Sequence, residues 1–310
     1  MLRHLRLPQV AAAFTRLDDK IKEGKWGTPS GPTAASSAPG APALTPFIQP
    51  GASGIIGGGE ESGLMVEFEH SEWSRAEFAA EFVENADHYI VERRRMLEVV
   101  LSFYRRFTRT RRSGRDTRLL DLGSGDGALS HELLKNDGTI RATLVDASPE
   151  MLECARRRLR SYPHVEFVER SFQQLLRDPD TPSEFDIVVS GLAIHHLELE
   201  AKKALFSYVF AHLDDGGDFV NLDVALAPDA SLEDWYMVLW HEWIRQHAER
   251  AGRQHEFDHV PQQYKTNPDN LPDTLDDQLS ALRAVGFEAV DCYYKYGVFV
   301  VFGGRKPRQA

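Results

Sequence analysis

The stretch "LLDLGSGDGALS", residues 119–130, decides the fold. An apolar run typical of a buried strand leads into a glycine-rich turn, and the turn leads into the start of a helix. The turn has the spacing G-x-G-x-G rather than the G-x-G-x-x-G of dinucleotide sites, and it carries carboxylates at Asp121 and Asp126. Because two negative charges would repel a pyrophosphate, the turn favours a ligand without phosphate.

A further carboxylate ends the next apolar stretch, "IRATLVD", residues 140–146. This stretch is typical of a strand, and its last residue, Asp146, follows the turn at about the distance where nucleotide-binding units place the acid that binds a ribose. The predicted ligand is therefore a nucleoside that carries positive charge and no phosphate. S-adenosylmethionine, which has an ammonium and a sulfonium group, fits this description.

Strand-like and helix-like segments alternate from Arg118 onward, with short loops between them. This alternation predicts an α/β fold: a doubly wound, mostly parallel seven-stranded sheet that helices cover on both faces. The closing stretches "EAVDCYYKY" and "VFVVFGGRK", joined by a tight turn at Gly297, predict a C-terminal antiparallel hairpin. Helix-like spacing before Arg118 predicts an N-terminal helical cap.

The composition divides the chain into three parts. Residues 1–63 include a long segment rich in Gly, Pro, Ala and Ser, which predicts a flexible tail or linker. Residues 64–116 form the expected cap. Residues 117–310 form the expected ligand-binding domain, with an insert on the acceptor side at about 224–272.

The charge and the cysteine content narrow the classes of partner. A formal net charge of −11 counts against a nucleic acid as the main partner. Cys154 and Cys292 are the only cysteines, so a reducing compartment is expected. No apolar run is long enough to span a membrane, and we expect a cytoplasmic protein without a membrane partner. Assembly into a homo-oligomer is left open.

Five motifs in order resemble the class I S-adenosylmethionine-dependent methyltransferases, and the resemblance covers residues 64–310. They are "DLGSGDG", "LVDASPEML", "FDIVVSGLAIHHL", "LDDGGDFVNLD" and the closing "LSALRAVGFEAVDCYYKYGVFVVFGGRK". The resemblance implies S-adenosylmethionine as cofactor and S-adenosylhomocysteine as product. It also implies transfer of a methyl group. The acidic charge and the aromatic segment after Asp223 favour an oxygen, nitrogen or thioether sulfur of a small molecule as the acceptor.

The resemblance also implies roles for single residues. Asp121 would orient the amino group of the cofactor, and Asp146 would bind its ribose. The family usually has an Asp where this chain has Ser171, so adenine recognition would pass to the Ser171 hydroxyl or to Gln173. The other cofactor residues that it implies are Gly123, Ser124, Gly125, Gly127, Ala147, Met151, Phe172, Ser190 and Gly191.

The acceptor site has fewer signals. His195 and His196 follow the fourth predicted strand; either one is a candidate general base, with His195 as first choice, or a packing or capping residue. A second group combines aromatic residues at helical spacing with part of "ADHYI", and either lines the acceptor pocket as a lid or packs against the core. Its members are His88, Tyr89, Tyr236, Trp240, Trp243 and His247.

Two further motifs lead to alternatives. "HEFDH", residues 255–259, matches a zinc-protease pattern, but its polar surroundings, with Gly252 and Pro261 close by, predict a loop and no metal. "RRFTRTRRSGR", residues 105–115, is typical of a solvated helix end. Read as a basic patch, it would suit an RNA-modifying enzyme of a transfer RNA pathway, since part of the chain also resembles carboxy-S-adenosylmethionine synthase. A non-catalytic scaffold that binds a protein partner is the third hypothesis.

Overall fold

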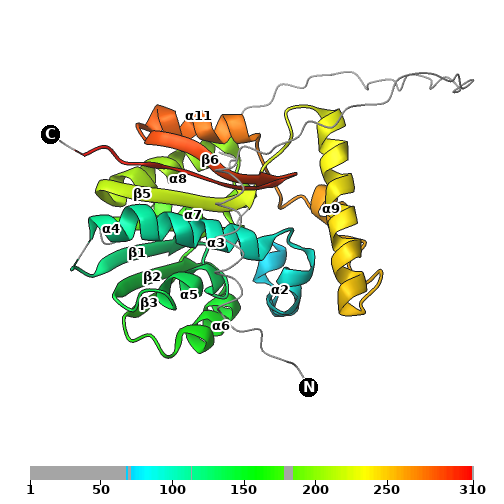
Figure 1. Ribbon diagram of the computed structural model, residues 1–310, viewed down its shortest axis with the longest axis horizontal. Helices are drawn as coiled ribbons and strands as arrows, with labels where there is room; N and C mark the ends of the chain where they lie inside the picture. The colour runs from blue at the N-terminus through cyan, green and yellow to red at the C-terminus, as the bar shows by residue number, and fades with distance from the viewer. Residues whose placement is uncertain (1–67, 69–70, 113, 178–183, 309–310) are drawn as a thin grey trace, which may run out of the picture. The chain divides into compact units, whose positions relative to one another are not determined.

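A seven-stranded sheet forms the centre of the described chain (Figure 1). The computed structural model describes residues 68, 71–112, 114–177 and 184–308, so the predicted tail at 1–63 lies outside it. The strand order is β3-β2-β1-β4-β5-β7-β6, with the first five strands parallel and β7 antiparallel to both neighbours. This confirms the predicted sheet and its closing hairpin. The strands are β1 (Thr117–Leu122), β2 (Ile140–Asp146), β3 (Val165–Glu169), β4 (Phe185–Gly191), β5 (Leu213–Val224), β6 (Glu288–Tyr296) and β7 (Phe299–Arg305).

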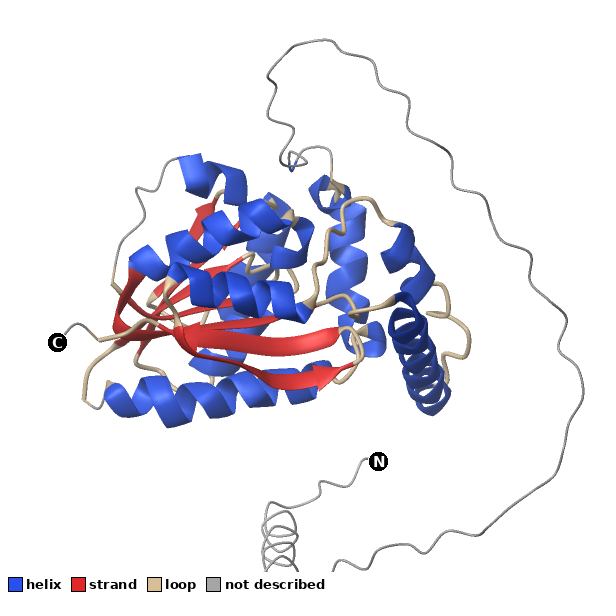
Figure 2. Cartoon of the chain, turned by 90° about the horizontal axis from the view of Figure 1, so that it is seen from above, coloured by secondary structure: helices blue, strands red, loops and turns tan. Residues whose placement is uncertain are grey.

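Helices lie on both faces of the sheet (Figure 2). One face packs against α3 (Arg93–Phe103), α5 (Ala128–Leu134) and α6 (Pro149–Leu159), and the other against α7 (Phe172–Arg177), α8 (Leu199–His212) and α11 (Leu275–Val285). The remaining helical segments are η2 (Glu72–Ser74), α2 (Ala76–Tyr89), η3 (Tyr104–Thr108), α4 (Arg109–Arg111), η4 (Ile194–His196), α9 (Ala230–Ala251) and α10 (Val260–Thr266).

Neighbouring residues of the inner strands enter different cores. Leu119, Val189 and Val301 belong to the core beneath α3 and α5, whereas Leu120, Val188 and Val300 belong to the core beneath α8 and α11. Successive side chains of a strand point to opposite faces, and here both faces are buried. This is why the strands are continuous apolar runs rather than alternating ones.

The arginine run ties the end of the cap helices to the sheet. The Arg109 Nε atom lies 2.6 Å from Asp137 Oδ2, and the Arg111 Nη2 atom lies 2.5 Å from the fully buried Asp218. Arg112 contacts the carboxylates of Asp186 and Asp214. These arginines neutralise carboxylates that the sheet buries or half-buries near the amino ends of its strands, which is a structural role.

The strand order places the switch point of the sheet between β1 and β4. The chain runs outward from β1 through β2 to β3 and then returns to β4 on the other side of β1. Parallel sheets bind ligands at such a point, outside the carboxyl ends of the strands. The turn after β1, Asp146 at the end of β2 and Gly191 at the end of β4 all lie at this edge. Helices α2 and α9 stand beside it (Figure 1).

Candidate active site

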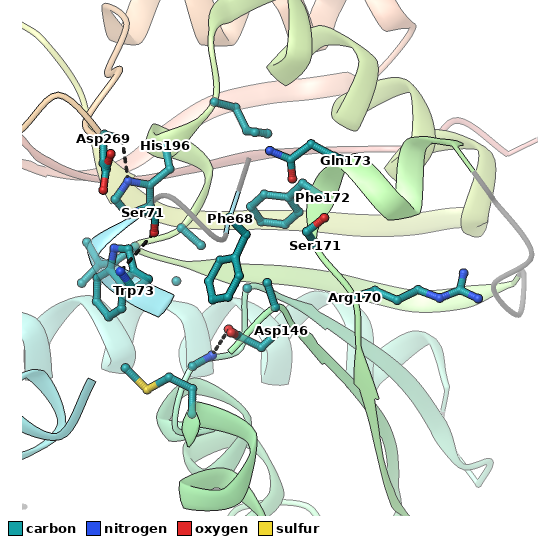
Figure 3. Close-up of a pocket in the computed structure, with 18 of the residues that line it drawn as sticks. Phe68, Ser71, Trp73, Asp146, Arg170, Ser171, Phe172, Gln173, His196 and Asp269 are labelled. Carbon is teal, nitrogen blue, oxygen red and sulfur yellow. Dashed lines mark hydrogen bonds between the residues drawn. The ribbon is translucent and has the colours of Figure 1, made fainter. Parts of the chain in front are cut away.

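A cavity of about 140 Å³, partly open to solvent, lies at this edge. Its wall is built by the turn after β1, the end of β2, the segments after β3 and β4, and the residues that precede α2 (Figure 3). Eight of the predicted cofactor residues line it: Gly123, Gly125, Asp146, Ala147, Met151, Ser171, Phe172 and Gly191. The structure thus brings together residues that are spread over 69 positions of sequence, from 123 to 191.

The glycines of the turn have different tasks. Gly123 has a φ of 64°, and a Cβ atom built on it would stand 2.3 Å from the Cβ of Ala193, so only glycine lets the turn pack against the segment after β4. Gly125 has a φ of 53°, but a Cβ atom there would meet no atom within 4 Å. Its backbone borders the cavity and leaves room for a ligand. Gly127 precedes α5 and does not belong to the cavity wall.

Asp146 is held at the wall by two backbone donors. Its Oδ2 accepts the N–H of Gly125 at 2.7 Å, and its Oδ1 accepts the N–H of Ser148 at 2.9 Å. Each carboxylate oxygen keeps acceptor capacity beyond these bonds. The fixed carboxylate is therefore suited to the two neighbouring hydroxyls of a ribose.

Asp121 lies behind the turn and is 1% exposed. Its Oδ2 accepts the hydroxyl of Ser130 at 2.6 Å, while its Oδ1 has no hydrogen-bond partner among the described residues. Burial, with the nearby negative charge of Asp146 adding to it, raises the pKa of Asp121 to about 7. A buried acceptor without a donor is costly, so this oxygen fits an ammonium group supplied by a ligand.

Two predicted serines hold the turn rather than line the cavity. Ser190 is fully buried and its hydroxyl donates to the carbonyl of Leu122 at 2.7 Å. Ser124 donates its backbone N–H to the carbonyl of Val145 at 3.0 Å. These bonds lock the ends of β1, β2 and β4 to one another.

The segment after β3 borders the cavity with Ser171, Phe172 and Gln173. The Ser171 hydroxyl accepts the N–H of Gln174 at 3.2 Å, and the Ser171 N–H donates to the Gln174 side chain at 2.8 Å. Ser171 therefore caps the start of α7. Gln173, the alternative adenine contact, is 7% exposed and lies in the wall.

The two histidines after β4 have different surroundings. The Nδ1 of His195 lies 2.6 Å from Asp223 Oδ1, and its backbone N–H donates to Asp223 Oδ2 at 3.1 Å, so this ring is fixed outside the cavity wall. His196 belongs to the wall. Its Nδ1 lies 2.8 Å from the carbonyl of Asp269, and because a carbonyl oxygen only accepts, Nδ1 carries the hydrogen.

The other ring nitrogen of His196, Nε2, is buried and has no hydrogen-bond partner among the described residues. Burial, followed by the effect of the neighbouring His195 ring, lowers the pKa of His196 to about 3. The imidazole is therefore neutral and presents Nε2 as a bare proton acceptor. The sequence placed His195 first for this role, but the structure places His196 at the cavity.

The sequence did not identify the cover of the cavity. Phe68, Trp73 and Phe82 line it, and the Trp73 ring lies edge-on to His196 with 5.9 Å between the ring centroids. The Glu72 N–H donates to Asp269 Oδ2 at 2.9 Å. Asp269 belongs to residues 267–274, which we call the strap. An isolated tryptophan before a helix and an aspartate in a polar loop carry no local signal of a site.

The predicted acceptor residues lie elsewhere. None of His88, Tyr89, Tyr236, Trp240, Trp243 and His247 is part of the cavity wall. The indole N–H groups of Trp240 and Trp243 donate to the Tyr89 carbonyl at 2.7 Å and to Glu92 Oε1 at 3.0 Å, which ties α9 to the end of α2 and the start of α3. His88 stacks on Phe257. Packing between helices accounts for these contacts, so an acceptor role for this group remains a prediction.

The zinc-like motif forms a series of turns between α9 and α10. His255 is exposed with a φ of 65° and contacts Asp258, so the two histidines do not share a helical face. The described part of the chain contains no cluster of three or more His, Cys, Asp or Glu side chains that could hold a metal ion. Within the same residues, no helix has both the length and the apolar character that crossing a membrane requires.

Comparison with known proteins identifies a methyltransferase domain in this chain. Residues 119–217 match the family model described as a methyltransferase domain. A demethylmenaquinone methyltransferase from Leptospira interrogans is 29% identical over 62% of this chain and 76% of its own length. A carboxy-S-adenosyl-L-methionine synthase from Psychrobacter arcticus is 25% identical over 66% of this chain and 78% of its own length.

A malonyl-[acyl-carrier protein] O-methyltransferase from Halalkalibacterium halodurans is 30% identical over 26% of this chain and 30% of its own length. Among solved structures, an O-methyltransferase family protein from Burkholderia thailandensis superimposes with a TM-score of 0.55 at 14% identity, over 78% of this chain and 64% of that protein. This likeness shows the fold. The matched residues therefore form a methyltransferase domain that depends on S-adenosylmethionine, and the likeness in structure shows the class I, Rossmann-like fold.

Proposed function

We propose that this chain transfers a methyl group from S-adenosylmethionine to an oxygen or nitrogen of a small-molecule acceptor, and that His196 receives the proton that the acceptor loses. The observation that carries the proposal is the bare Nε2 of a neutral histidine at the wall of the cofactor cavity. A thioether acceptor loses no proton and would therefore need no proton acceptor such as Nε2.

The residues at the cavity suit the cofactor of the family. When bound, S-adenosylmethionine supplies a methyl group on positively charged sulfur. Asp146 would hold the ribose, and the unpartnered oxygen of Asp121 would receive the ammonium group. A Cβ atom on Gly125 would meet no atom within 4 Å, so the turn leaves open space beside the cavity for the ligand. Met151, Phe172 and Gln173 would surround the adenine.

His196 would act as a hydrogen-bond acceptor before it acts as a base. With its pKa lowered to about 3 by burial, the ring does not remove a proton in advance. Nε2 would instead orient an O–H or N–H group and take its proton as the new bond to carbon forms. Nε2 is buried and the Trp73 ring lies beside His196, so the acceptor would reach this atom only if neighbouring side chains such as Trp73 shift.

The cavity wall and the surface favour a small acceptor. The cavity wall carries several apolar side chains, namely Phe68, Trp73, Phe82, Leu192 and Leu197. Such a wall suits a compact organic molecule better than a polyanion. The ion pairs of the arginine run and the formal charge of −11 count against an RNA substrate. The name of the Leptospira relative points in the same direction.

Calorimetric titration with S-adenosylmethionine, with NAD as the parallel control, tests the cofactor assignment. We expect saturable binding of the first and none of the second. Acceptor screening by mass spectrometry then tests the reaction, with S-adenosylhomocysteine as the expected second product. Carboxymethylated rather than methylated products, or binding of NAD alone, would overturn the proposal.

A further inference from the structure

A lysine is buried beneath the strap. Lys202, in α8, has no exposed side-chain surface. Its Nζ donates to the carbonyl of Leu271 at 2.5 Å and contacts the carboxylate of Asp273. A buried ammonium group is strongly unfavourable unless charges and acceptors surround it. Lys202 therefore holds the strap in one position, because movement of the strap would leave the buried ammonium group without its acceptors.

The same strap holds both histidines. The Leu271 N–H donates to the carbonyl of His195 at 2.8 Å, and the Asp269 carbonyl accepts the Nδ1–H of His196 at 2.8 Å. The acceptor of Lys202 and the acceptor of His196 are thus two residues apart on one short segment. At its far end the strap is fixed again, since the Leu226 N–H donates to the Asp273 carbonyl at 2.9 Å.

The Asp269 carbonyl determines which nitrogen of His196 is bare. A neutral imidazole carries one hydrogen, and the hydrogen bond made by one nitrogen sets the tautomer of the ring. With Nδ1–H donating to Asp269, Nε2 is the acceptor. If the strap moved, water or another group would replace the carbonyl, and the hydrogen would distribute over both nitrogens.

We propose that Lys202 is a positioning residue: through Leu271 and Asp273 it holds the Asp269 carbonyl against His196, and so keeps Nε2 free to receive the acceptor's proton. The functional part of this inference rests on the proposed function, which gives Nε2 its task. The structural part concerns the tautomer of His196 and stands independently of any acceptor.

The test measures the ring tautomer of His196 in two-bond ¹H–¹⁵N correlation spectra of the full-length, ¹⁵N-labelled protein. The signals of this ring are assigned by their absence from the spectrum of His196→Gln. We expect a single Nδ1–H tautomer in the wild type. Lys202→Met should convert it to a mixture with substantial Nε2–H, while the affinity for S-adenosylmethionine stays within about twofold, because Lys202 does not line the cavity. Lys203→Met, which removes an exposed lysine paired with Glu200, should leave the tautomer unchanged.

Each outcome separates the two proposals. An Nε2–H tautomer in the wild type would overturn the positioning role without any variant, and so would an unchanged Nδ1–H tautomer in folded Lys202→Met. If Lys202→Met does not fold, Asp273→Asn provides the second variant, since it removes the counter-charge with little change in size; the same mixture is expected, and an unchanged spectrum would refute the role. Failure of S-adenosylmethionine to bind the wild type, with the expected tautomer present, would instead count against the proposed function alone.

Discussion

The two sides of the cavity are built in different ways. On the cofactor side, the defining hydrogen bonds join residues close in sequence: Gly125 with Asp146 over 21 positions, and Asp121 with Ser130 over 9. On the acceptor side, Glu72 bonds to Asp269 over 197 positions and to Asn267 over 195. A short sequence motif therefore contains most of the cofactor side, whereas the acceptor side forms only when the whole domain has folded.

The largest effect, a loss of affinity for S-adenosylmethionine, is expected from a substitution of Asp146 on the cofactor side. Asp146→Ala removes the ribose acceptor and leaves the Gly125 N–H without its partner. Hydrogen bonds to a charged group contribute roughly 1.5–3 kcal/mol each, so the affinity for S-adenosylmethionine should fall by at least about 100-fold in calorimetry. Glu169→Ala, an exposed carboxylate at the end of the neighbouring strand, is the control and should bind normally. Unchanged binding by Asp146→Ala would refute the ribose assignment.

A substitution of His196 tests the acceptor side of the cavity. His196→Gln should lower kcat by about 100-fold, the usual contribution of a positioned proton acceptor, while the cofactor affinity stays close to that of the wild type. Steady-state assays with the identified acceptor measure the first effect and calorimetry the second. His255→Gln, at an exposed turn, is the matched control. A full rate in His196→Gln would show that the proton leaves by another path.

A substitution of Gly123 tests the close packing of the glycine turn against Ala193, in the segment after β4. In Gly123→Ala the new Cβ atom would lie 2.3 Å from Ala193, so we expect a loss of about 2 kcal/mol in the free energy of unfolding. Gly125→Ala shares the left-handed backbone but meets no atom, and about 1 kcal/mol is expected from strain alone. Urea unfolding of both variants gives the comparison. Equal losses would mean that close packing at Gly123 is unimportant.

A smaller, pH-dependent effect is expected at Asp121. Burial raises the pKa of Asp121 to about 7, so the free protein takes up a proton on this carboxyl as the pH falls through 7. A cationic amino group binds the ionised form, and the affinity for S-adenosylmethionine should therefore drop by about tenfold from about pH 8 to about pH 6. Asp121→Asn should bind weakly with a flat profile.

Binding of adenosine distinguishes a pH dependence caused by Asp121 from one caused by Asp146. Adenosine offers the ribose without the amino group, and burial also raises the pKa of Asp146. We expect calorimetry to show adenosine affinity nearly constant over the same range. A parallel fall for adenosine would assign the pH dependence to Asp146 instead.

The sequence predicted the parts of the fold and site that depend on local patterns. Continuous apolar runs identified strands buried on both faces, and the spacing of Gly123 and Gly125 before Asp146 identified the cavity wall. Phe68, Trp73 and Asp269 could not be found this way, since their proximity results from contacts between the two ends of the domain.

Helical spacing also has a limit that α9 illustrates. The pattern correctly placed Trp240 and Trp243 on one buried face, but a buried face can border a ligand or another helix. Their N–H groups donate to Tyr89 at the end of α2 and to Glu92 at the start of α3, which only the packing of these helices against α9 determines. His195 and His196 show the same limit, because adjacent residues in a short 3₁₀ turn point to different surroundings.

The bond between Glu72 and Asp269 also sets an order of assembly. Domains form as the ribosome releases the chain from its amino end, so the cofactor turn and its partner Asp146 emerge long before the strap has been translated. A nascent chain would therefore pass through a stage with a nucleoside-binding half-site but no cover and no fixed His196. If the proposed roles hold, the residues for the cofactor would come together early in synthesis, and the proton acceptor His196 would be fixed only near its end.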